Sequence, residues 1–212
     1  MKKIYILGAG GFGRELLWWI KDINREKPTW EIMGFLDDNL NALDGVECDY
    51  KVVGTIKDWC PKEDEEFALA FGSPELKRKI VKIMKDKGAK FASIIHPTAL
   101  VSEFAHYGEG LVMFPYSKLS CNSEIGDFVT ILSTPIGHDN VIGEYTVISG
   151  GCNIVRNVKI GKDVFIAAGV AIAQDVVIGD GAYLGLASVV LKDVPEGTTV
   201  FGNPARVVPG SK

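Results

Sequence analysis

Aliphatic residues recur with a constant spacing along the second half of the chain. From residue 142 to residue 190 an aliphatic side chain stands at every sixth position: Ile142, Ile148, Ile154, Ile160, Ile166, Ile172, Ile178, Leu184 and Val190. The same spacing runs upstream, with Tyr107 as the one non-aliphatic member: Ile95, Val101, Tyr107, Met113, Leu119, Ile125 and Ile131. One step is shorter, because Ile136 follows Ile131 after only five residues, just before His138.

A period of six residues fits neither an α-helix, which repeats every 3.6 residues, nor a flat strand, which repeats every two. It fits a coil of short strands and sharp corners in which one aliphatic side chain per side points inward. Three sides make a turn of about 18 residues, and successive turns stack at the usual strand spacing of ~4.8 Å. Glycines that directly follow aliphatic residues, such as Gly126 and Gly143, are expected to form the corners. The sequence therefore predicts an all-β parallel β-helix over residues 93–212.

The pattern over residues 1–92 is different, since strand-like and helix-like segments alternate there. The expected strands cover residues 3–7, 31–36 and 67–71, and the expected helices cover residues 13–23 and 74–87. This alternation is typical of a small Rossmann-like α/β domain with a parallel sheet. About 90 residues hold only half of a doubly wound sheet, so a mononucleotide fits better than a dinucleotide. A nucleotide-sugar is therefore favoured over NAD as the ligand of this domain.

Composition and charge exclude several classes of partner. The chain has 212 residues, 47% of them hydrophobic, and a formal net charge of −4 with scattered lysines, which disfavours nucleic acid and anionic membranes. No apolar run approaches the ~20 residues of a membrane span, and the N-terminal apolar stretch is too short for a signal peptide. The cysteines lack the spacing of zinc ligands, so no metal is predicted, and free thiols in the cytoplasm are expected: Cys48, Cys60, Cys121 and Cys152.

A glycine-rich loop lies between the first expected strand and the first expected helix. Its glycines follow a GxGxxG pattern: Gly8, Gly10, Gly11 and Gly13. Such a loop presents backbone N–H groups and a helix N-terminus to a phosphate, although it can also be a tight turn that packs helix on strand. Asp37 and Asp38 follow the second strand, where they can accept hydrogen bonds from a ribose or a base.

His138 is the main candidate for a catalytic residue. It follows the short step in the repeat, and Asp139 comes directly after it. Adjacent strand residues point to opposite faces, so Asp139 can orient His138 only if the chain bends there, and the short step can supply that bend. The alternative is an exposed polar residue on a coil, while His96 and His106 are expected to be structural. A carbonic anhydrase on this fold would need a further histidine within residues 143–151, which contain none.

Short strings along the whole chain carry a family resemblance. Residues 137–143 (GHDNVIG), 157–161 (NVKIG) and 202–206 (GNPAR) look like the sialic acid O-acetyltransferase family and its relatives that N-acetylate UDP-linked 4-amino sugars in bacillosamine synthesis. The resemblance also includes residues 8–13 and 35–38. It implies a left-handed β-helix, acetyl-CoA as the cosubstrate, and a homotrimer in which CoA lies between two subunits.

The resemblance implies roles for individual residues. His138 would be the general base, supported by Asp139. The nucleotide-sugar would be bound by the glycine loop and by four further residues: Asp37, Asp38, Gly72 and Ser73. CoA would be bound by three residues of the β-helix: Arg156, Ala168 and Leu186.

The chain departs from the family pattern at three places. Val147 replaces a second histidine near the acetyl group, Arg156 replaces a glycine beside the thioester, and Ser133 and Thr134 replace an Asn-Thr pair. In the expected reaction a sugar amine or hydroxyl attacks the acetyl thioester while His138 removes the proton. The alternatives are an acetyltransferase for sialic acid, for another free sugar or for an amino acid such as serine, and a non-catalytic nucleotide-sugar-binding protein, which the changes at residues 147 and 156 would favour.

Overall fold

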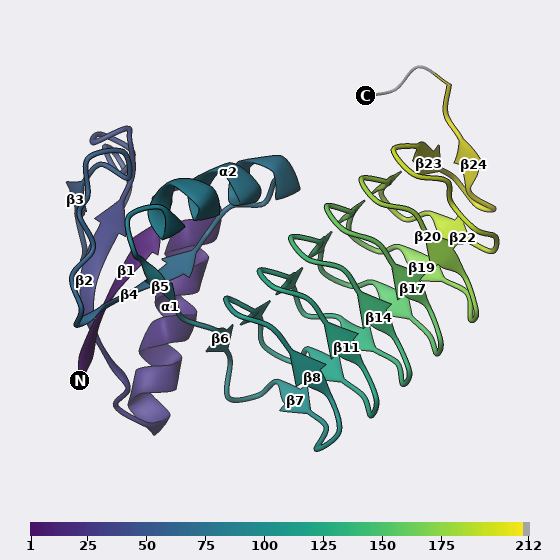
Figure 1. Cartoon of the computed structure of the whole chain (residues 1–212), viewed down its shortest axis with the longest axis horizontal. Helices are drawn as coiled ribbons and strands as arrows, with labels where there is room; N and C mark the ends of the chain where they lie inside the picture. The colour runs from purple at the N-terminus through teal and green to yellow at the C-terminus, as the bar shows by residue number, and fades with distance from the viewer. Residues whose placement is uncertain (210–212) are drawn as a thin grey trace. The chain divides into compact units, whose positions relative to one another are not determined.

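The computed structural model describes residues 1–209, and the chain divides into two compact units, residues 1–97 and residues from 98 onward (Figure 1). The first unit is a small α/β domain and the second is a parallel β-helix, which confirms the fold class expected from the sequence. The unit boundary lies between Pro97 and Thr98, five residues beyond the boundary expected from the change of period. Ile95, which shares the six-residue spacing, therefore belongs to the first unit.

The first unit is built on a five-stranded parallel sheet with the strand order β3-β2-β1-β4-β5. Its elements are β1 (Lys2–Leu7), α1 (Gly11–Glu26), β2 (Trp30–Leu36), β3 (Val52–Gly54), β4 (Glu65–Leu69), α2 (Pro74–Lys85), β5 (Lys90–Phe91) and β6 (Ile94–Ile95). Helix α1 begins two residues earlier than expected and buries Leu16, Leu17 and Ile20. Strand β4 ends two residues earlier than expected, at Leu69.

The direction of strand addition reverses at β1. Strand β2 pairs with one edge of β1 and β4 pairs with the other edge, so the chain winds outward in both directions from the centre of the sheet. In open parallel sheets a ligand binds outside the carboxyl ends of the strands at such a switch point. The loops that leave β1 and β4 are residues 8–10 and 70–73, which include Gly8, Gly10 and Gly72.

The second unit winds through three sides made of parallel strands, most of them two residues long. The first side contains β7 (Leu100–Val101), β10 (Lys118–Leu119), β13 (Pro135–Ile136), β16 (Asn153–Ile154), β19 (Ala171–Ile172) and β22 (Val189–Val190). The second side contains β8 (His106–Tyr107), β11 (Glu124–Ile125), β14 (Val141–Ile142), β17 (Lys159–Ile160) and β20 (Val177–Ile178). The third side contains β9 (Val112–Met113), β12 (Thr130–Ile131), β15 (Val147–Ile148), β18 (Phe165–Ile166), β21 (Tyr183–Leu184), β23 (Thr199–Phe201) and the antiparallel β24 (Arg206–Val207).

The aliphatic residue of each repeat is the second residue of its strand and points into the prism. From Met113 to Val190 every one of these residues is buried, as the six-residue period predicts. Val101 and Tyr107 differ, because they remain 37% and 46% exposed. They lie on β7 and β8, which are the end strands of the first and second sides.

A second buried column, not seen in the sequence, stands two residues before the aliphatic one. Its members are a mixture of polar and apolar residues: Leu111, Ser117, Ser123, Val129, Thr134, Asn140, Thr146, Cys152, Val158, Val164, Val170, Val176, Ala182 and Ser188. The polar members bond to the backbone of the corners; the Thr146 hydroxyl donates to the Gly161 carbonyl at 2.9 Å, and the Asn140 amide donates to the Gly137 and Val155 carbonyls at 2.8 Å. Buried polar groups are thereby satisfied, which removes the cost of placing them inside.

From Gly110 to Ala187 the corners are formed by residues with a left-handed backbone, three positions before each aliphatic residue. Ten of them are not glycine: Tyr116, Asn122, Phe128, Ser133, Asp139, Tyr145, Asn157, Asp163, Asp175 and Ala187. The glycines that directly follow the aliphatic residues therefore have a purpose other than the one predicted. A Cβ on Gly143 would lie 2.5 Å from the backbone carbonyl carbon of Gly161 in the next coil, so these glycines permit close stacking and do not make the turn.

Substitution of Gly143 by Ala is expected to destabilise the β-helix, because the new Cβ has only backbone to displace. Overpacking typically costs about 1–3 kcal/mol, or a Tm lower by roughly 2–10 °C in a chain of this size. Gly150→Ala is the matched control, since its Cβ would find nothing nearer than 3.6 Å. Thermal unfolding followed by circular dichroism should separate the two variants; equal Tm values would contradict the stacking explanation.

Candidate active site

One corner of the β-helix carries the candidate catalytic residues. This corner, between the first and second sides, is called the His138 corner and consists of stacked residue pairs: Cys121–Asn122, His138–Asp139, Arg156–Asn157 and Gln174–Asp175. Backbone hydrogen bonds join the coils, with the Asp139 amide donating to the Cys121 carbonyl and the Asn157 amide donating to the His138 carbonyl, both at 3.0 Å. Residues far apart in the sequence therefore form one continuous edge.

His138 and Asp139 are in direct contact. His138 Nδ1 lies 2.5 Å from Asp139 Oδ2, and each side chain is 47% exposed. A carboxylate can only accept, so Nδ1 donates the hydrogen bond and Nε2 is left as the acceptor on the ring. This is the arrangement that a general base requires.

The bend that brings these two side chains together has a different origin from the one expected. Asp139 has a φ of 59°, and the equivalent residues at the other corners also have positive φ values. This left-handed backbone turns the chain between His138 and Val141. The short step lies one corner earlier, between Ile131 and Ile136. The contact between His138 and Asp139 therefore comes from the regular corner geometry.

The charge on Asp139 is stabilised from several directions. The hydrogen bond from His138, followed by one from the Asn122 amide, holds the pKa of the Asp139 carboxyl below its usual value, and the positive charge of Arg156 adds to this. The Asn122 Nδ2 lies 3.0 Å from Asp139 Oδ1. Both oxygens of the carboxylate are thus engaged, one by the histidine and one by an amide from the preceding coil.

The other two histidines occupy different places. His96 is buried in the first unit, with Nε2 3.6 Å from Asp22 Oδ2 and its ring edge-on to Trp19. His106 is exposed on β8 and is paired in register with Glu124. Within residues 1–209 no group of three or more His, Cys, Asp or Glu side chains is placed to hold a metal ion.

The three residues expected to bind CoA lie on two different corners. Arg156 is one coil beyond His138, with Nη1 3.5 Å from Asp175 Oδ1. Ala168 and Leu186 lie on the corner between the third and first sides, called the Leu186 corner, and the Leu186 side chain is 61% exposed. The whole first side separates the two corners, so a single chain does not bring the three residues together.

Of the residues that depart from the family pattern, Arg156 lies on the His138 corner, whereas Val147, Ser133 and Thr134 lie outside it. Val147 is buried on β15 of the third side, while Ser133 forms a corner with a φ of 42°. Thr134 is buried in the second inner column, where its hydroxyl donates to the Ser149 carbonyl at 2.9 Å.

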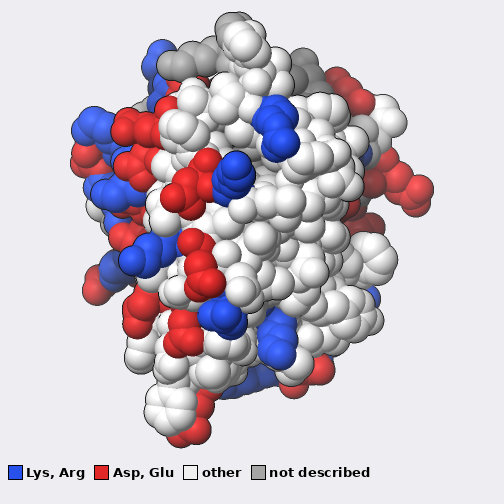
Figure 2. Space-filling view, turned by 90° about the vertical axis from the view of Figure 1, so that its right-hand side faces the viewer, with Lys and Arg blue, Asp and Glu red and all other residues white. Residues whose placement is uncertain are grey.

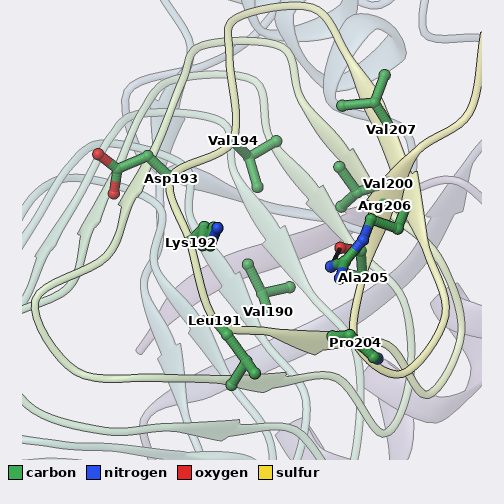
Figure 3. Close-up of a pocket in the computed structure, with 10 residues that line it drawn as sticks. All are labelled: Val190, Leu191, Lys192, Asp193, Val194, Val200, Pro204, Ala205, Arg206 and Val207. Carbon is green, nitrogen blue, oxygen red and sulfur yellow. Dashed lines mark hydrogen bonds between the residues drawn. The ribbon is translucent and has the colours of Figure 1, made fainter.

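A cavity of about 360 Å³ opens at the last coil of the β-helix (Figure 3). Val190, Val194 and Val200 form an apolar wall, and Lys192 and Arg206 supply two cations. Lys192 continues the spacing of the His138 corner three coils beyond His138, which corresponds to about 14 Å at ~4.8 Å per coil. Lys192 has no motif around it, and Arg206 was noted only as part of residues 202–206, because the relation of either cation to His138 exists only after the coils are stacked.

The glycines of the first unit divide into two kinds. Gly8 has a φ of +99°, and a Cβ on Gly13 would lie 2.0 Å from the Gly8 carbonyl oxygen, so both are needed by the turn itself. A Cβ on Gly10 or Gly72 would meet nothing within 4 Å. The space beside Gly10 is therefore open, and Gly10 is also the N-cap of α1, with no side-chain cap and no acidic residue in the first turn.

The polar residues expected to bind the nucleotide also hold the backbone. Asp37 accepts from the Ala9 amide at 2.8 Å and from the Asn39 amide at 2.9 Å, and Asp38 accepts from the Lys57 amide at 3.0 Å. Ser73 caps α2 by accepting from the Leu76 amide at 3.3 Å.

One residue near the glycine loop was missed by the sequence analysis. The guanidinium of Arg14 folds back toward the start of α1, with Nη2 3.8 Å from the point where a Cβ on Gly11 would lie. A cation at a positively polarised helix N-terminus favours an anionic ligand. The signal in the sequence is its position, directly after the last glycine of the GxGxxG pattern.

Comparison with known proteins identifies the family. Residues 3–84 match the family described as PglD N-terminal domain, and residues 157–191 match the family described as bacterial transferase hexapeptide (six repeats). The chain is 32% identical to GDP-perosamine N-acetyltransferase of Escherichia coli over an alignment of 214 positions, covering 95% of this chain and 94% of the relative. The protein belongs to this family of hexapeptide-repeat sugar N-acetyltransferases.

Solved structures support the assignment. The acetyltransferase domain of PglB from Neisseria gonorrhoeae, in complex with acetyl coenzyme A, is 29% identical and superposes with a TM-score of 0.88 over 98% of this chain and 99% of that one. PerB from Caulobacter crescentus, in complex with CoA and GDP-perosamine, is 22% identical with a TM-score of 0.86 over 98% of both chains, and it shares the fold. This sugar N-acetyltransferase is therefore an acetyl-CoA-dependent enzyme, as the family resemblance implied.

Two surface properties of the acetyltransferase bear on its partners. Neither helix within residues 1–209 is long and apolar enough to cross a bilayer. On the face drawn in Figure 2 basic and acidic side chains are interspersed, and a broad area between them carries neither.

The two kinds of glycine in the first unit predict different defects. Gly10→Val is expected to leave the acetyltransferase folded and to raise the KM for the nucleotide-sugar at least tenfold, because the side chain would enter the open space at the α1 N-terminus. Gly13→Val should unfold the first unit, since its Cβ has only 2.0 Å to the Gly8 carbonyl oxygen. Steady-state kinetics and circular dichroism measure the two effects. An unchanged KM in Gly10→Val would mean that the loop only packs helix on strand.

Proposed function

We propose that the protein transfers the acetyl group of acetyl-CoA to the amino group of a nucleotide-linked amino-deoxy sugar, with His138 as the general base. The observation that carries the proposal is the contact of His138 Nδ1 with Asp139 Oδ2 at 2.5 Å, which leaves Nε2 as a proton acceptor. The nitrogen of the sugar amine forms a bond to the thioester carbonyl carbon, its proton passes to Nε2, and the bond from carbon to sulfur breaks. The thiolate of CoA leaves and takes up the proton. GDP-perosamine, named for the 32% identical relative, is a substrate of this class.

The first unit would hold the nucleotide. Its diphosphate would lie at the switch point between β1 and β4, against the open side of Gly10 and the N-terminus of α1, with Arg14 as a counter-charge. Asp37 and Asp38 retain lone pairs for the ribose or the base, and their bonds to backbone amides fix their positions. Gly72 and Ser73 lie at the neighbouring strand end and complete the set.

Acetyl-CoA would lie along the His138 corner. In this orientation the thioester is at His138, the pantetheine arm passes Arg156, and the phosphates reach Lys192 and Arg206 at the cavity of the last coil. Arginine and lysine side chains are the usual ligands of phosphate groups. Three coil steps separate His138 from Lys192, so the pantetheine arm would span about 14 Å between the thioester and the phosphates.

A homotrimer with its threefold axis parallel to the β-helix would complete this site. The pantetheine arm can follow only one corner of a given chain. Ala168 and Leu186 lie on the other corner, six residues before the equivalent positions of the His138 corner. The first side lies between the two corners and separates them by at most ~20 Å. Rotation about a threefold axis would bring the Leu186 corner of one subunit to the His138 corner of its neighbour. We place the enzyme in the cytoplasm, in keeping with its four free cysteines.

Replacement of His138 by Ala is expected to lower kcat by roughly 10²- to 10⁴-fold while both substrates still bind. The half-exposed ring fills no core position, so the variant should fold. His138→Asn should be nearly as inactive, and Asp139→Asn should lose less, because it changes the orientation of the ring without removing it. His106→Ala is the control and should retain wild-type kcat. Single-turnover assays of acetyl transfer decide the matter; wild-type turnover by folded His138→Ala would exclude the general-base mechanism.

Complementation between inactive subunits tests the shared site. His138→Ala damages one corner and Leu186→Glu damages the other, so each variant alone should show little activity. In trimers assembled from equal amounts of both chains, about a quarter of the sites would combine two intact corners, and activity should return to about a quarter of wild type. Light scattering confirms the assembly. Mixed trimers that remain inactive would show that one chain supplies both corners.

A further inference from the structure

The carboxylate of Asp139 is held by donors from two different coils. His138 Nδ1 lies 2.5 Å from Oδ2, and the Asn122 side-chain amide donates to Oδ1 at 3.0 Å. Asn122 is 17 residues before Asp139 in the sequence and lies directly beneath it on the His138 corner. The three side chains thus form a continuous chain from an amide through a carboxylate to the imidazole.

We propose that Asn122 is a positioning residue of the acetyltransferase reaction: by holding Oδ1, it keeps Oδ2 of Asp139 on His138 Nδ1 and so keeps Nε2 directed at the acceptor. The proposal rests on the role of His138 given above. Asp139 is half exposed, and a carboxylate at the surface would otherwise turn about its side-chain bonds and exchange the imidazole for water. A second hydrogen bond, on the other oxygen, restricts that rotation.

The chemistry of an asparagine suits this position. Its amide donates without cancelling the negative charge that orients the imidazole, whereas a lysine or arginine would compete with His138 for the carboxylate. Asn122 also has a φ of 55°, a left-handed conformation that asparagine tolerates better than most residues. The ionisable groups near Asp139 are His138 on its own corner and Arg156 on the next coil, and Arg156 is in turn 3.5 Å from Asp175.

An equivalent Asn–Asp hydrogen bond lies on the same corner, but its aspartate does not contact His138. Asn157 has a φ of 56°, and its amide donates to Asp175 Oδ1 at 2.7 Å. Backbone conformation, donor and acceptor all match those of the Asn122 contact. Asn157 therefore provides a control for any general effect of removing such a bond from the β-helix.

The first experiment compares Asn122→Gly with Asn157→Gly. Glycine accepts the left-handed backbone, so each variant removes the amide without adding strain. Asn122→Gly is expected to lower kcat roughly tenfold or more at unchanged KM for both substrates, the effect of losing a hydrogen bond to a charged group. Asn157→Gly should keep wild-type kcat at saturating acetyl-CoA. Equal losses of kcat in both variants, or wild-type kcat in Asn122→Gly, would overturn the proposal.

The pH dependence of Asn122→Asp provides a signature that a structural role would not produce. In this variant the new carboxyl group lies beside the carboxylate of Asp139, and repulsion between the two negative charges raises the pKa of the pair. The new carboxyl group can donate a hydrogen bond to Asp139 in place of the amide only at low pH, where the pair holds a proton. Relative to wild type, kcat should therefore fall further as the pH rises through this raised pKa, while the ratio for Asn122→Gly stays constant. A constant ratio for Asn122→Asp would contradict the proposal.

A readout without turnover separates this proposal from the general-base mechanism. The chain has 3 histidines, so the side-chain nitrogen resonances of His138 can be assigned by comparison with His138→Asn. Wild type should show the proton on Nδ1, and Asn122→Gly should show a mixture of tautomers. If His138→Ala is inactive while Asn122→Gly keeps both wild-type kcat and a single tautomer, the positioning role alone is wrong. If His138→Ala is fully active, the proposed reaction mechanism is wrong.

Discussion

The stacking of one coil on the next, through parallel backbone hydrogen bonds, is the constraint on which the rest of the β-helix depends. Because each coil repeats after three sides, a position in an interior coil has a neighbour directly above and below it. Glycines after the inward aliphatic residues are necessary for this close approach, as the contact of Gly143 with Gly161 shows. Polar residues of the second inner column then satisfy the backbone of the corners, as Asn140 and Thr146 do. A column of side chains on one edge is the direct result.

The candidate site is a consequence of that columnar order. Left-handed residues at the corners direct consecutive side chains outward along one edge, which is why His138 and Asp139 can meet even though they are adjacent in sequence. The same geometry places Asn122 below the pair and Arg156 above it. An extended substrate such as acetyl-CoA suits a linear edge, since each coil offers one further contact along its length.

Much of the fold follows from the sequence because burial leaves a pattern in it. The aliphatic period predicted the prism and its inward residues, and the glycine pattern predicted the loop after β1. The second inner column was missed because it mixes polar residues such as Asn140 with aliphatic ones such as Val158, so no common hydrophobicity marks it. Asn122 and Lys192 were missed for another reason: each acquires its significance from a neighbour that only the folded chain supplies. Arg14 differs, because its position directly after Gly13 could have indicated its proximity to the glycine loop. Asn122 and Asp139, for example, are 17 residues apart, while Asn157 and Asp175 are 18 apart.

The short step between Ile131 and Ile136 explains that difference and shows what the site can tolerate. It removes one residue from the coil that connects Asn122 to Asp139, yet the backbone of Asp139 still bonds to Cys121 and the corner keeps its left-handed residue. Stacking of the coils, and not a fixed number of residues between them, therefore determines which side chains meet. The first unit follows the same logic on a smaller scale, since Gly13 is required by contact with Gly8, whereas Gly10 faces open space and is available to a ligand. In both units the candidate site residues, such as Gly10 and His138, are ones that the packing of the fold leaves accessible to a ligand.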